Sequence, residues 1–401
     1  MRILMATNYQ PPHRGGIEYA AGSLKRCWEE SGHLVTWITT DIPRGGTPQT
    51  PDNIRIPALN VFEFLFQINS PVISPLSHRE IEREVMDHDV VNVHSLAPGL
   101  TSAVLGAALK FKRPTVATQH VGVIPLRLPL LNLIQRNVIC GTAKHLIREG
   151  ALLTFVGKAV RDWFVERAHL PEDRIFMTPA GIDHRDYYFV TDQDRYAFRR
   201  KWDIDQNRLN VLFVGRFYEK KGLPLLQIVA QRCPSAHFTF VGSGPIHPEK
   251  WNLPNVRIIP HVSTEELREI YGAHDVFIMP SVGEGWPAVV PQAMACGLSC
   301  LISEETFEGY GQDPQTFMIC ERDVDIIART LAKLVAGRIP AQKLRKEISD
   351  YAMNRWDWKR TANTYLDLFN RVIKASPKVQ MSPLSPSGST EDASSSPQKS
   401  G

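Results

Sequence analysis

Short apolar runs of strand length recur along this chain, with helix-length segments between them. The first run is Arg2–Thr7, followed by a glycine-bearing loop, a helix over Gly16–Ser31 and a strand over His33–Thr39. Strand, loop, helix and strand in this order form a βαβ unit, which requires a parallel sheet covered by helices. The alternation therefore predicts an α/β protein with doubly wound sheets.

Two such series lie in tandem. The remaining strands of the first series are expected at Val90–His94, Pro114–Gln119 and Thr154–Val156. The strands of the second series are expected at Leu209–Gly215, His237–Val241, Val256–Ile259, Asp275–Met279 and Ser299–Ile302. Doubly wound sheets bind ligands at the carboxyl ends of their strands. Two Rossmann-like halves therefore place the expected site in a cleft between them.

Changes in composition divide the chain into five parts. We expect an N-terminal Rossmann-like domain over 1–185, a polar linker over 186–207 and a second Rossmann-like domain over 208–355. Aromatic residues at helical spacing predict a closing helix over 356–375. The Ser- and Pro-rich tail, 376–401, has too few large apolar residues to order itself and is predicted to be disordered.

Overall composition excludes several classes. A formal charge of +4 on 401 residues is small, and no nucleic-acid-binding motif is present. The six cysteines are scattered without zinc-site spacing, which favours free thiols in a reducing compartment. Met1–Ala6 is too short for a signal peptide, and no apolar run reaches the length of a membrane span. A cytoplasmic protein is expected, free or attached to the inner face of the membrane.

The segment from Pro280 to Gly297 carries the strongest chemical signal. A strand ends here and the chain turns through Glu284, Gly285 and Trp286 into a helix that a glycine terminates. A carboxylate at this point can accept hydrogen bonds from sugar hydroxyls. The free N–H groups at the start of the helix suit anionic oxygens.

A second loop follows the strand that ends at Val214. Gly215 allows close approach of a ligand to the backbone, and Arg216 and Lys221 supply two cations suited to a diphosphate. Gly242 follows the next strand in the same way. An isolated Arg and Lys would more often be solvated surface charges, but their combination with Glu284 favours a binding site.

Taken together, these motifs resemble the family 4 glycosyltransferases, retaining enzymes of the GT-B fold. The resemblance extends to about residue 375. It includes Gly15-Gly16-Ile17-Glu18, similar to the glycine-rich loop of that family, and Pro179-Ala180-Gly181-Ile182-Asp183, similar to the end of its first domain. The Gly215–Gly222 loop matches the family's diphosphate loop. Glu284 to Gln292 occupies the position of the family's motif of two glutamates with seven residues between them.

The resemblance implies a role for each matched residue. Arg216 and Lys221 would hold the donor diphosphate and stabilise the leaving group. Glu284 and His120 would contact the transferred sugar, although a structural, hydrogen-bonded role for His120 remains the alternative. Gly15 and Gly16 would form a loop near donor or acceptor. The implied donor-binding residues are Gly215, Arg216, Lys221, Gly242, Glu284, Gly285, Trp286 and Gln292, and the implied catalytic residues are Glu284, His120, Arg216 and Lys221.

Two positions depart from the family pattern. Gln292 replaces the second glutamate, which in the family accepts hydrogen bonds from the ribose, and Ala180 replaces a common asparagine. Glutamine retains one carbonyl acceptor but lacks the charge and the second acceptor oxygen. Weaker or altered nucleotide binding is therefore expected.

No cofactor and no metal site are expected, in agreement with the resemblance. The acid pairs Asp87/Asp89 and Asp203/Asp205 are interpreted as solvated turn residues. His94, at the end of a strand, either lines the cleft or borders it. The basic and apolar segment 121–152, with Arg136 and Lys144, either lies on an anionic membrane or packs as an ordinary amphipathic pair of helices.

The function predicted from the sequence is retaining transfer of a sugar from a UDP or GDP sugar to an acceptor hydroxyl. The expected partners are the nucleotide sugar and a glycan or lipid-linked acceptor, with no nucleic acid. Two alternatives remain open: a nucleotide-sugar epimerase or isomerase of the same fold, and a non-catalytic nucleotide-sugar-binding homologue, which Gln292 makes plausible.

Overall fold

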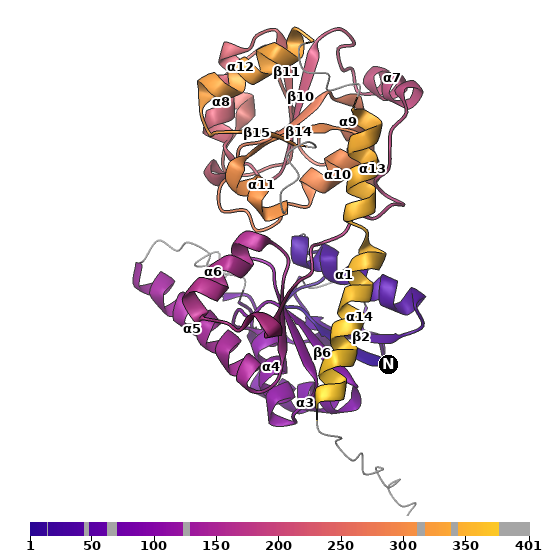
Figure 1. Cartoon of the computed structure of the whole chain (residues 1–401), viewed down its shortest axis with the longest axis vertical. Helices are drawn as coiled ribbons and strands as arrows, with labels where there is room; N and C mark the ends of the chain where they lie inside the picture. Colours follow the sequence, from indigo (N-terminus) through magenta and orange to yellow (C-terminus); the bar gives the residue numbers. More distant parts are fainter. Residues whose placement is uncertain are drawn as a thin grey trace, which may run out of the picture.

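A computed structural model describes residues 1–13, 15–43, 48–61, 70–122, 129–310, 317–337 and 344–376. Two α/β domains follow one another along the long axis of the molecule (Figure 1). Each is built on a parallel sheet, and this confirms the predicted fold class. The predicted disordered tail lies outside the described residues, apart from Ser376.

The first domain contains a seven-stranded parallel sheet in the order β3-β2-β1-β6-β7-β8-β9. The chain starts in the middle of the sheet and winds outward in both directions, as doubly wound folds do. Its strands are β1 Arg2–Ala6, β2 Leu34–Thr40, β3 Asn53–Ile56, β6 Val90–His94, β7 Thr115–Gln119, β8 Leu152–Phe155 and β9 Ile175–Met177, with β4 Ala58–Leu59 and β5 Val72–Ile73 in a small antiparallel pair. Its helices are α1 Gly16–Glu30, η1 Pro75–Ser77, α3 His78–Asp87, α4 Leu100–Lys110, α5 Pro129–Arg148, α6 Lys158–Ala168 and η2 Glu172–Arg174.

The second domain contains a six-stranded parallel sheet in the order β12-β11-β10-β13-β14-β15. Its strands are β10 Leu209–Val214, β11 Ala236–Val241, β12 Val256–Ile259, β13 Val276–Met279, β14 Ser299–Ser303 and β15 Phe317–Cys320. Its helices are η3 Glu219–Lys221, α8 Leu223–Arg232, η4 Pro248–Trp251, α9 Thr264–Ala273, α10 Val289–Ala295, α11 Glu304–Tyr310, α12 Val324–Val335 and α13 Arg345–Arg355. Because β10 lies between β11 and β13, the loops that follow these three strands emerge side by side.

The stretch expected as a linker, 186–207, contains a helix, α7 Asp192–Lys201, that packs on α9. Two of its arginines are buried and share one carboxylate. Arg195 Nη2 lies 2.5 Å from Asp275 Oδ1, and Arg199 Nη2 lies 2.9 Å from Asp275 Oδ2. Asp275 precedes β13 in the chain, so the pairing ties α7 to the second domain. The apolar pattern was weak because arginines occupy the buried face of this helix.

The chain ends in a long helix, α14 Trp358–Ala375, that returns to the first domain and packs along α1 (Figure 1). Trp28 is fully buried there, and its Nε1–H donates to the carbonyl of Ala362 at 3.2 Å. The two crossings between the domains run side by side, with Ile182 N donating to the carbonyl of Trp356 at 2.5 Å. The chain therefore passes between the domains through one pair of adjacent segments.

Candidate active site

Two glycine loops at the carboxyl ends of β10 and β11 pack against each other. Gly215 N donates to the carbonyl of Val241 at 3.0 Å, and Phe217 N donates to the carbonyl of Ser243 at 2.8 Å. Gly242 lies so close to the Gly215 carbonyl that a β-carbon on Gly242 would overlap it. The sequence motifs around Gly215 and Gly242 therefore form one surface at the end of the sheet.

The loop that carries Lys221 is also fastened to the loop that carries Glu284. Val282 N donates to the carbonyl of Lys220 at 2.9 Å. Gly222 adopts φ 83°, and a β-carbon there would lie 2.6 Å from the carbonyl oxygen of Pro280. A glycine is required at this position because both the left-handed backbone and the close approach exclude a side chain.

These contacts bring Lys221 and Glu284 together. Lys221 Nζ lies 2.9 Å from Glu284 Oε1, and the two side chains are only 15% and 11% exposed. Burial lowers the pKa of Lys221, and the Coulomb attraction and hydrogen bond of Glu284 partly oppose that effect. Arg216 is exposed, with its guanidinium 5.1 Å from the centre of the Tyr218 ring. A buried ion pair with a second, solvent-facing cation beside it suits an anionic ligand.

Gly285, next to Glu284, is where the second domain meets the first. A β-carbon on Gly285 would lie 2.7 Å from the carbonyl oxygen of His120, which directly follows β7. A β-carbon on Gly157, which follows β8, would overlap the Gly285 carbonyl oxygen, and helices α6 and α11 pack against each other nearby. The structure thus brings Glu284, Lys221 and His120 to one place, where strand ends of both sheets face each other.

His120 is paired with His94 rather than with a carboxylate. His94 Nδ1 lies 2.8 Å from His120 Nε2. Burial lowers the pKa of His120 to about 4, and burial together with the neighbouring ring lowers the pKa of His94 well below its ordinary value. Both rings are therefore neutral at physiological pH. His94, which the sequence left between lining and bordering the cleft, is completely buried behind His120.

Trp286 and Gln292 sit further into the protein than the other motif residues. The Trp286 ring lies 5.3 Å from that of Tyr310 and 6.1 Å from that of Trp356, so it packs beside the domain crossing. Gln292 lies on α10 and is 8% exposed. Trp286 therefore packs against aromatic side chains, and Gln292 is almost completely buried.

Gly15 and Gly16 form the start of α1 in the first domain. Gly15 is the N-cap residue, and the Glu18 carboxylate folds back over it. Glu18 is buried and its Oε1 lies 3.0 Å from His13 Nδ1. A β-carbon on Gly16 would meet no atom within 4 Å. Packing within the described residues therefore does not explain why a glycine stands at position 16.

Two residues near the motif loops were missing from the predicted site. Glu305 Oε1 accepts a hydrogen bond from Gly283 N at 2.7 Å, which fixes the loop that carries Glu284. Glu18 was part of a motif but had no assigned role. No signal in the sequence marked Glu305, because its partner is a backbone N–H 22 residues away.

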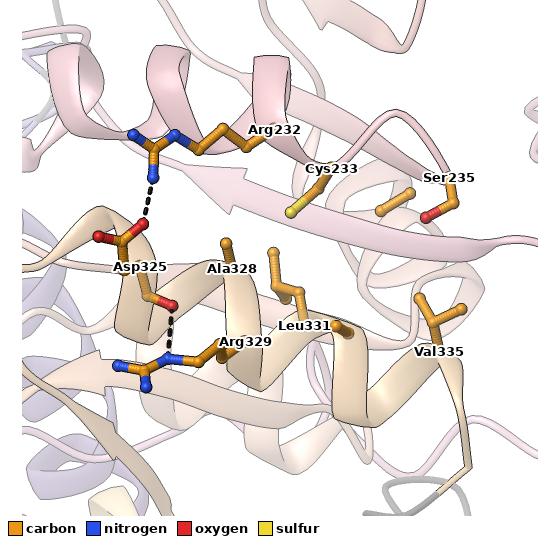
Figure 2. A pocket seen from close by; sticks show the side chains of 10 residues that line it. Arg232, Cys233, Ser235, Asp325, Ala328, Arg329, Leu331 and Val335 are labelled. Carbon is orange, nitrogen blue, oxygen red and sulfur yellow. Dashed lines mark hydrogen bonds and ion pairs between the residues drawn. The ribbon is translucent and has the colours of Figure 1, made fainter.

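A hollow of about 610 Å³ lies elsewhere, between α8 and α12 on the outer face of the second domain (Figure 2). Arg232 and Asp325 form an ion pair at its edge, and it contains none of the predicted site residues. Among the described residues, no group of three or more His, Cys, Asp and Glu side chains could hold a metal ion. None of the helices in the described ranges has the length and apolar character needed to cross a bilayer.

The sequence matches two family models, one in each domain. Residues 14–186 match "Glycosyltransferase Family 4", and residues 208–337 match "Glycosyl transferases group 1". The two matches together span more than half of the chain and cover every predicted site residue. The fold and the site define a GT-B glycosyltransferase, and the chain belongs to glycosyltransferase family 4.

Individual relatives agree with this assignment. The chain is 23% identical to phosphatidyl-myo-inositol mannosyltransferase of Mycobacterium tuberculosis, over 95% of this chain and 100% of that one. Among solved structures it resembles sucrose-phosphate synthase from Thermosynechococcus elongatus, with a TM-score of 0.73, 18% identity and coverage of 94% and 100%. It also resembles Anabaena HepE in complex with UDP, with a TM-score of 0.73, 14% identity and coverage of 92% and 100%. The chain is thus similar over nearly its whole length to known glycosyltransferases.

Proposed function

We propose that this glycosyltransferase moves a sugar from a nucleoside diphosphate sugar to an acceptor hydroxyl with retention of the anomeric configuration. The observation that carries the proposal is the Lys221–Glu284 pair, 2.9 Å apart and largely buried where the two domains meet. Such a pair offers a cation for the diphosphate and a carboxylate for the sugar within one loop cluster. Matches to transferase families favour this reading over an epimerase or isomerase.

Donor binding would rearrange this pair. A diphosphate entering between Arg216 and Lys221 supplies new anionic partners for both cations, and Glu284 is then free to accept hydrogen bonds from sugar hydroxyls. Preorganised cations stabilise the negative charge that develops on the leaving diphosphate. The tight packing of the loops around Gly222 holds these groups without reorganisation at the moment of reaction.

In the chemical step the bond between the anomeric carbon and the diphosphate oxygen breaks, and the acceptor oxygen bonds to the same face of that carbon. The acceptor proton passes to the released phosphate oxygen, so no protein base is needed. Closure of the domains at Gly285 and His120 would exclude water from the oxocarbenium-like centre. No metal ion is required, because Arg216 and Lys221 supply the positive charge.

The donor is proposed to be a UDP or GDP sugar, and the acceptor a lipid-linked molecule or a glycan. HepE, whose fold this chain shares, was solved in complex with UDP. The name of the mycobacterial relative specifies a phosphatidyl-myo-inositol acceptor. These relatives support a nucleotide-sugar donor and a lipid or glycan acceptor for this chain.

Peripheral membrane contact through 121–152 is part of the proposal. Helix α5 exposes apolar side chains along one side: Leu130 is 66% exposed, Leu133 43%, Ile134 48% and Val138 43%. Arg136 and Arg148 are exposed on the same helix. The predicted segment also includes 123–128, outside the described residues. An apolar stripe accompanied by arginines suits the surface of an anionic bilayer.

Liposome flotation at low salt tests the membrane contact. We expect the protein to float with anionic vesicles and a Leu133→Ser/Ile134→Ser double variant to remain behind. Ile228→Ser is the matched control, since Ile228 is 43% exposed on α8 of the second domain. Equal flotation of all three proteins, or none for the wild type, would refute this part of the proposal.

NMR of the transfer product tests the proposed reaction. With donor and acceptor supplied, we expect release of nucleoside diphosphate and a glycosidic bond of the same anomeric configuration as the donor. An inverted product would overturn the proposed stereochemistry. Tight nucleotide binding without any transfer or hydrolysis would favour the non-catalytic alternative.

A further inference from the structure

Two histidines from neighbouring strands meet behind the domain contact. His94 is the last residue of β6 and His120 directly follows β7, and these strands pair in parallel with His94 beside Thr118. His94 Nδ1 and His120 Nε2 are 2.8 Å apart, which is a hydrogen-bond distance. Since neither ring nitrogen faces a carboxylate in this contact, one histidine must donate to the other.

We infer that His94 sets the ring tautomer of His120, so that His120 carries its proton on Nδ1 and offers a donor to the bound sugar. His94 is a positioning residue in this inference, since it acts through His120. The identity of the ligand rests on the proposed function; the tautomer itself does not.

Only two neutral arrangements fit the contact. A neutral imidazole has one donor nitrogen and one acceptor nitrogen. Either His94 donates from Nδ1 and His120 carries its proton on Nδ1, or His120 donates from Nε2 and His94 carries its proton on Nε2. The two arrangements therefore differ at the far nitrogen of each ring.

The far nitrogen of His94 distinguishes them. His94 is completely buried, and its Nε2 has no hydrogen-bond partner in the part of the chain that the structure describes. A proton on Nε2 would be a buried donor without an acceptor, whereas a bare nitrogen there is only an unused lone pair. Orphaned buried N–H groups are rarer than under-satisfied acceptors. The proton of His94 therefore lies on Nδ1, pointing toward His120.

The second domain contains a histidine with the same arrangement. His274 is completely buried, and its Nδ1 lies 2.6 Å from the carbonyl oxygen of Ile270. A carbonyl can only accept, so His274 must carry its proton on Nδ1. Its Nε2, like that of His94, has no partner within the described ranges. This fold thus already accommodates a buried histidine with a bare Nε2.

The closing helix keeps His94 in place. The Tyr365 ring of α14 lies 6.4 Å from the His94 ring. The Tyr365 hydroxyl is held by three threonine hydroxyls, Thr118 at 2.9 Å, Thr178 at 3.0 Å and Thr154 at 3.3 Å. These threonines come from three neighbouring parts of the first sheet. His94 consequently sits between a fixed aromatic ring and His120.

The inferred tautomer would add a hydrogen-bond donor to a site whose Glu284 carboxylate is an acceptor. His120 abuts Gly285 through its carbonyl, and Glu284 is the next residue along that loop. A carboxylate only accepts hydrogen bonds, whereas Nδ1–H of His120 donates one. A sugar hydroxyl is both donor and acceptor, so it can satisfy both groups at once. The inferred tautomer would therefore suit a hydroxyl-bearing ligand without adding charge to the site.

Long-range ¹H–¹⁵N NMR of the ligand-free full chain, labelled at its histidines, reads the tautomer directly. The His120 signals are assigned by their loss in His120→Asn. We expect the proton of His120 on Nδ1 and its Nε2 as a bare acceptor. A proton on His120 Nε2 would overturn the inference. The result does not depend on donor or acceptor, so it is separate from any failure of the proposed function.

Variants of His94 test its positioning role. The amide N–H of Asn can occupy the place of Nδ1, whereas Phe fills the volume without a donor. We expect His94→Asn to keep the His120 tautomer and most of kcat, and His94→Phe to lose the Nδ1–H signal and about tenfold in kcat with little change in KM. His88→Asn is the control, since His88 is buried beside Thr36 away from the domain contact. Identical tautomers and rates in the Asn and Phe variants would contradict the role.

Discussion

Two pairs of polar side chains lie near the contact between the domains, and they differ in charge. In the second domain, Lys221 and Glu284 are charged, are partly accessible and belong to loops fixed by backbone contacts. In the first domain, His94 and His120 are neutral, and burial depresses the pKa of both. The charged pair thus lies on the side expected to bind the donor, while the pair in the facing domain offers uncharged hydrogen bonds. In the proposed function, Lys221 serves the leaving diphosphate, while Glu284 and His120 contact the sugar from the two sides.

Removing the positive charge of Lys221 should have the largest effect on catalysis. We expect Lys221→Ala to lower kcat on the order of 10²- to 10³-fold, because a preorganised partner of the developing negative charge is lost. Lys220→Ala is the matched control, since Lys220 is exposed and contacts Val282 only through its backbone carbonyl. Steady-state transfer kinetics measure the difference. Equal losses in both variants would show that Lys221 has no special role.

The neutral histidines should make stability depend on pH. The pKa values of His120 and His274 are about 4, below their ordinary value of 6.5. Between these values the unfolded chain binds protons that the native state does not, so the free energy of unfolding falls as pH decreases. The slope is at most about 1.4 kcal/mol per pH unit for each histidine.

Denaturant titrations between pH 6.5 and 4.5 check this slope. His120→Asn and His274→Asn should each show a shallower decrease than the wild type, and His184→Asn, at an exposed position, is the control. Parallel curves for all four proteins would mean that neither histidine is held neutral by burial.

Gly16 distinguishes a ligand contact from a packing contact in the first domain. Among the described residues, a β-carbon at Gly16 would meet no atom from another part of the chain within 4 Å, so Gly16→Ala should fold normally. We expect about a tenfold loss in kcat/KM if a substrate approaches this backbone. Gly22→Ala in the same helix is the control, because its β-carbon would make only an ordinary 3.7 Å contact with Trp37. Unchanged kinetics in Gly16→Ala would remove this loop from the site.

Gln292→Glu should have the smallest effect. If position 292 accepts hydrogen bonds from the ribose, a carboxylate should strengthen nucleoside diphosphate binding by about 1 kcal/mol, or about fivefold. Calorimetry compares it with Gln231→Glu, an exposed glutamine on α8. Unchanged or weaker binding in Gln292→Glu would exclude the ribose role.

The second domain was easier to predict from the sequence than the first. Gly215, Lys221, Glu284 and Gly285 lie in loops that follow apolar strands, so their spacing predicted where in the fold they lie. The helix over Asp192–Lys201 was missed because Arg195 and Arg199, rather than apolar residues, fill its buried face.

The contact between His94 and His120 could not be predicted from the sequence. His94 and His120 are 26 residues apart, and only the pairing of β6 with β7 makes them neighbours. The role of Glu305 could not be predicted for a similar reason, since its carboxylate accepts a hydrogen bond from a backbone N–H rather than from a side chain. Contacts that depend on strand order or on backbone groups leave no local pattern in the chain.

Calorimetric titration with UDP, GDP and ADP, without added metal, tests the central claim most directly. We predict that at least one nucleoside diphosphate binds the wild type, and that Arg216→Ala and Lys221→Ala each weaken that binding at least tenfold while Lys220→Ala does not. Binding that is indifferent to Arg216 and Lys221, or no binding by any of the three, would contradict the assignment of these loops to the donor diphosphate.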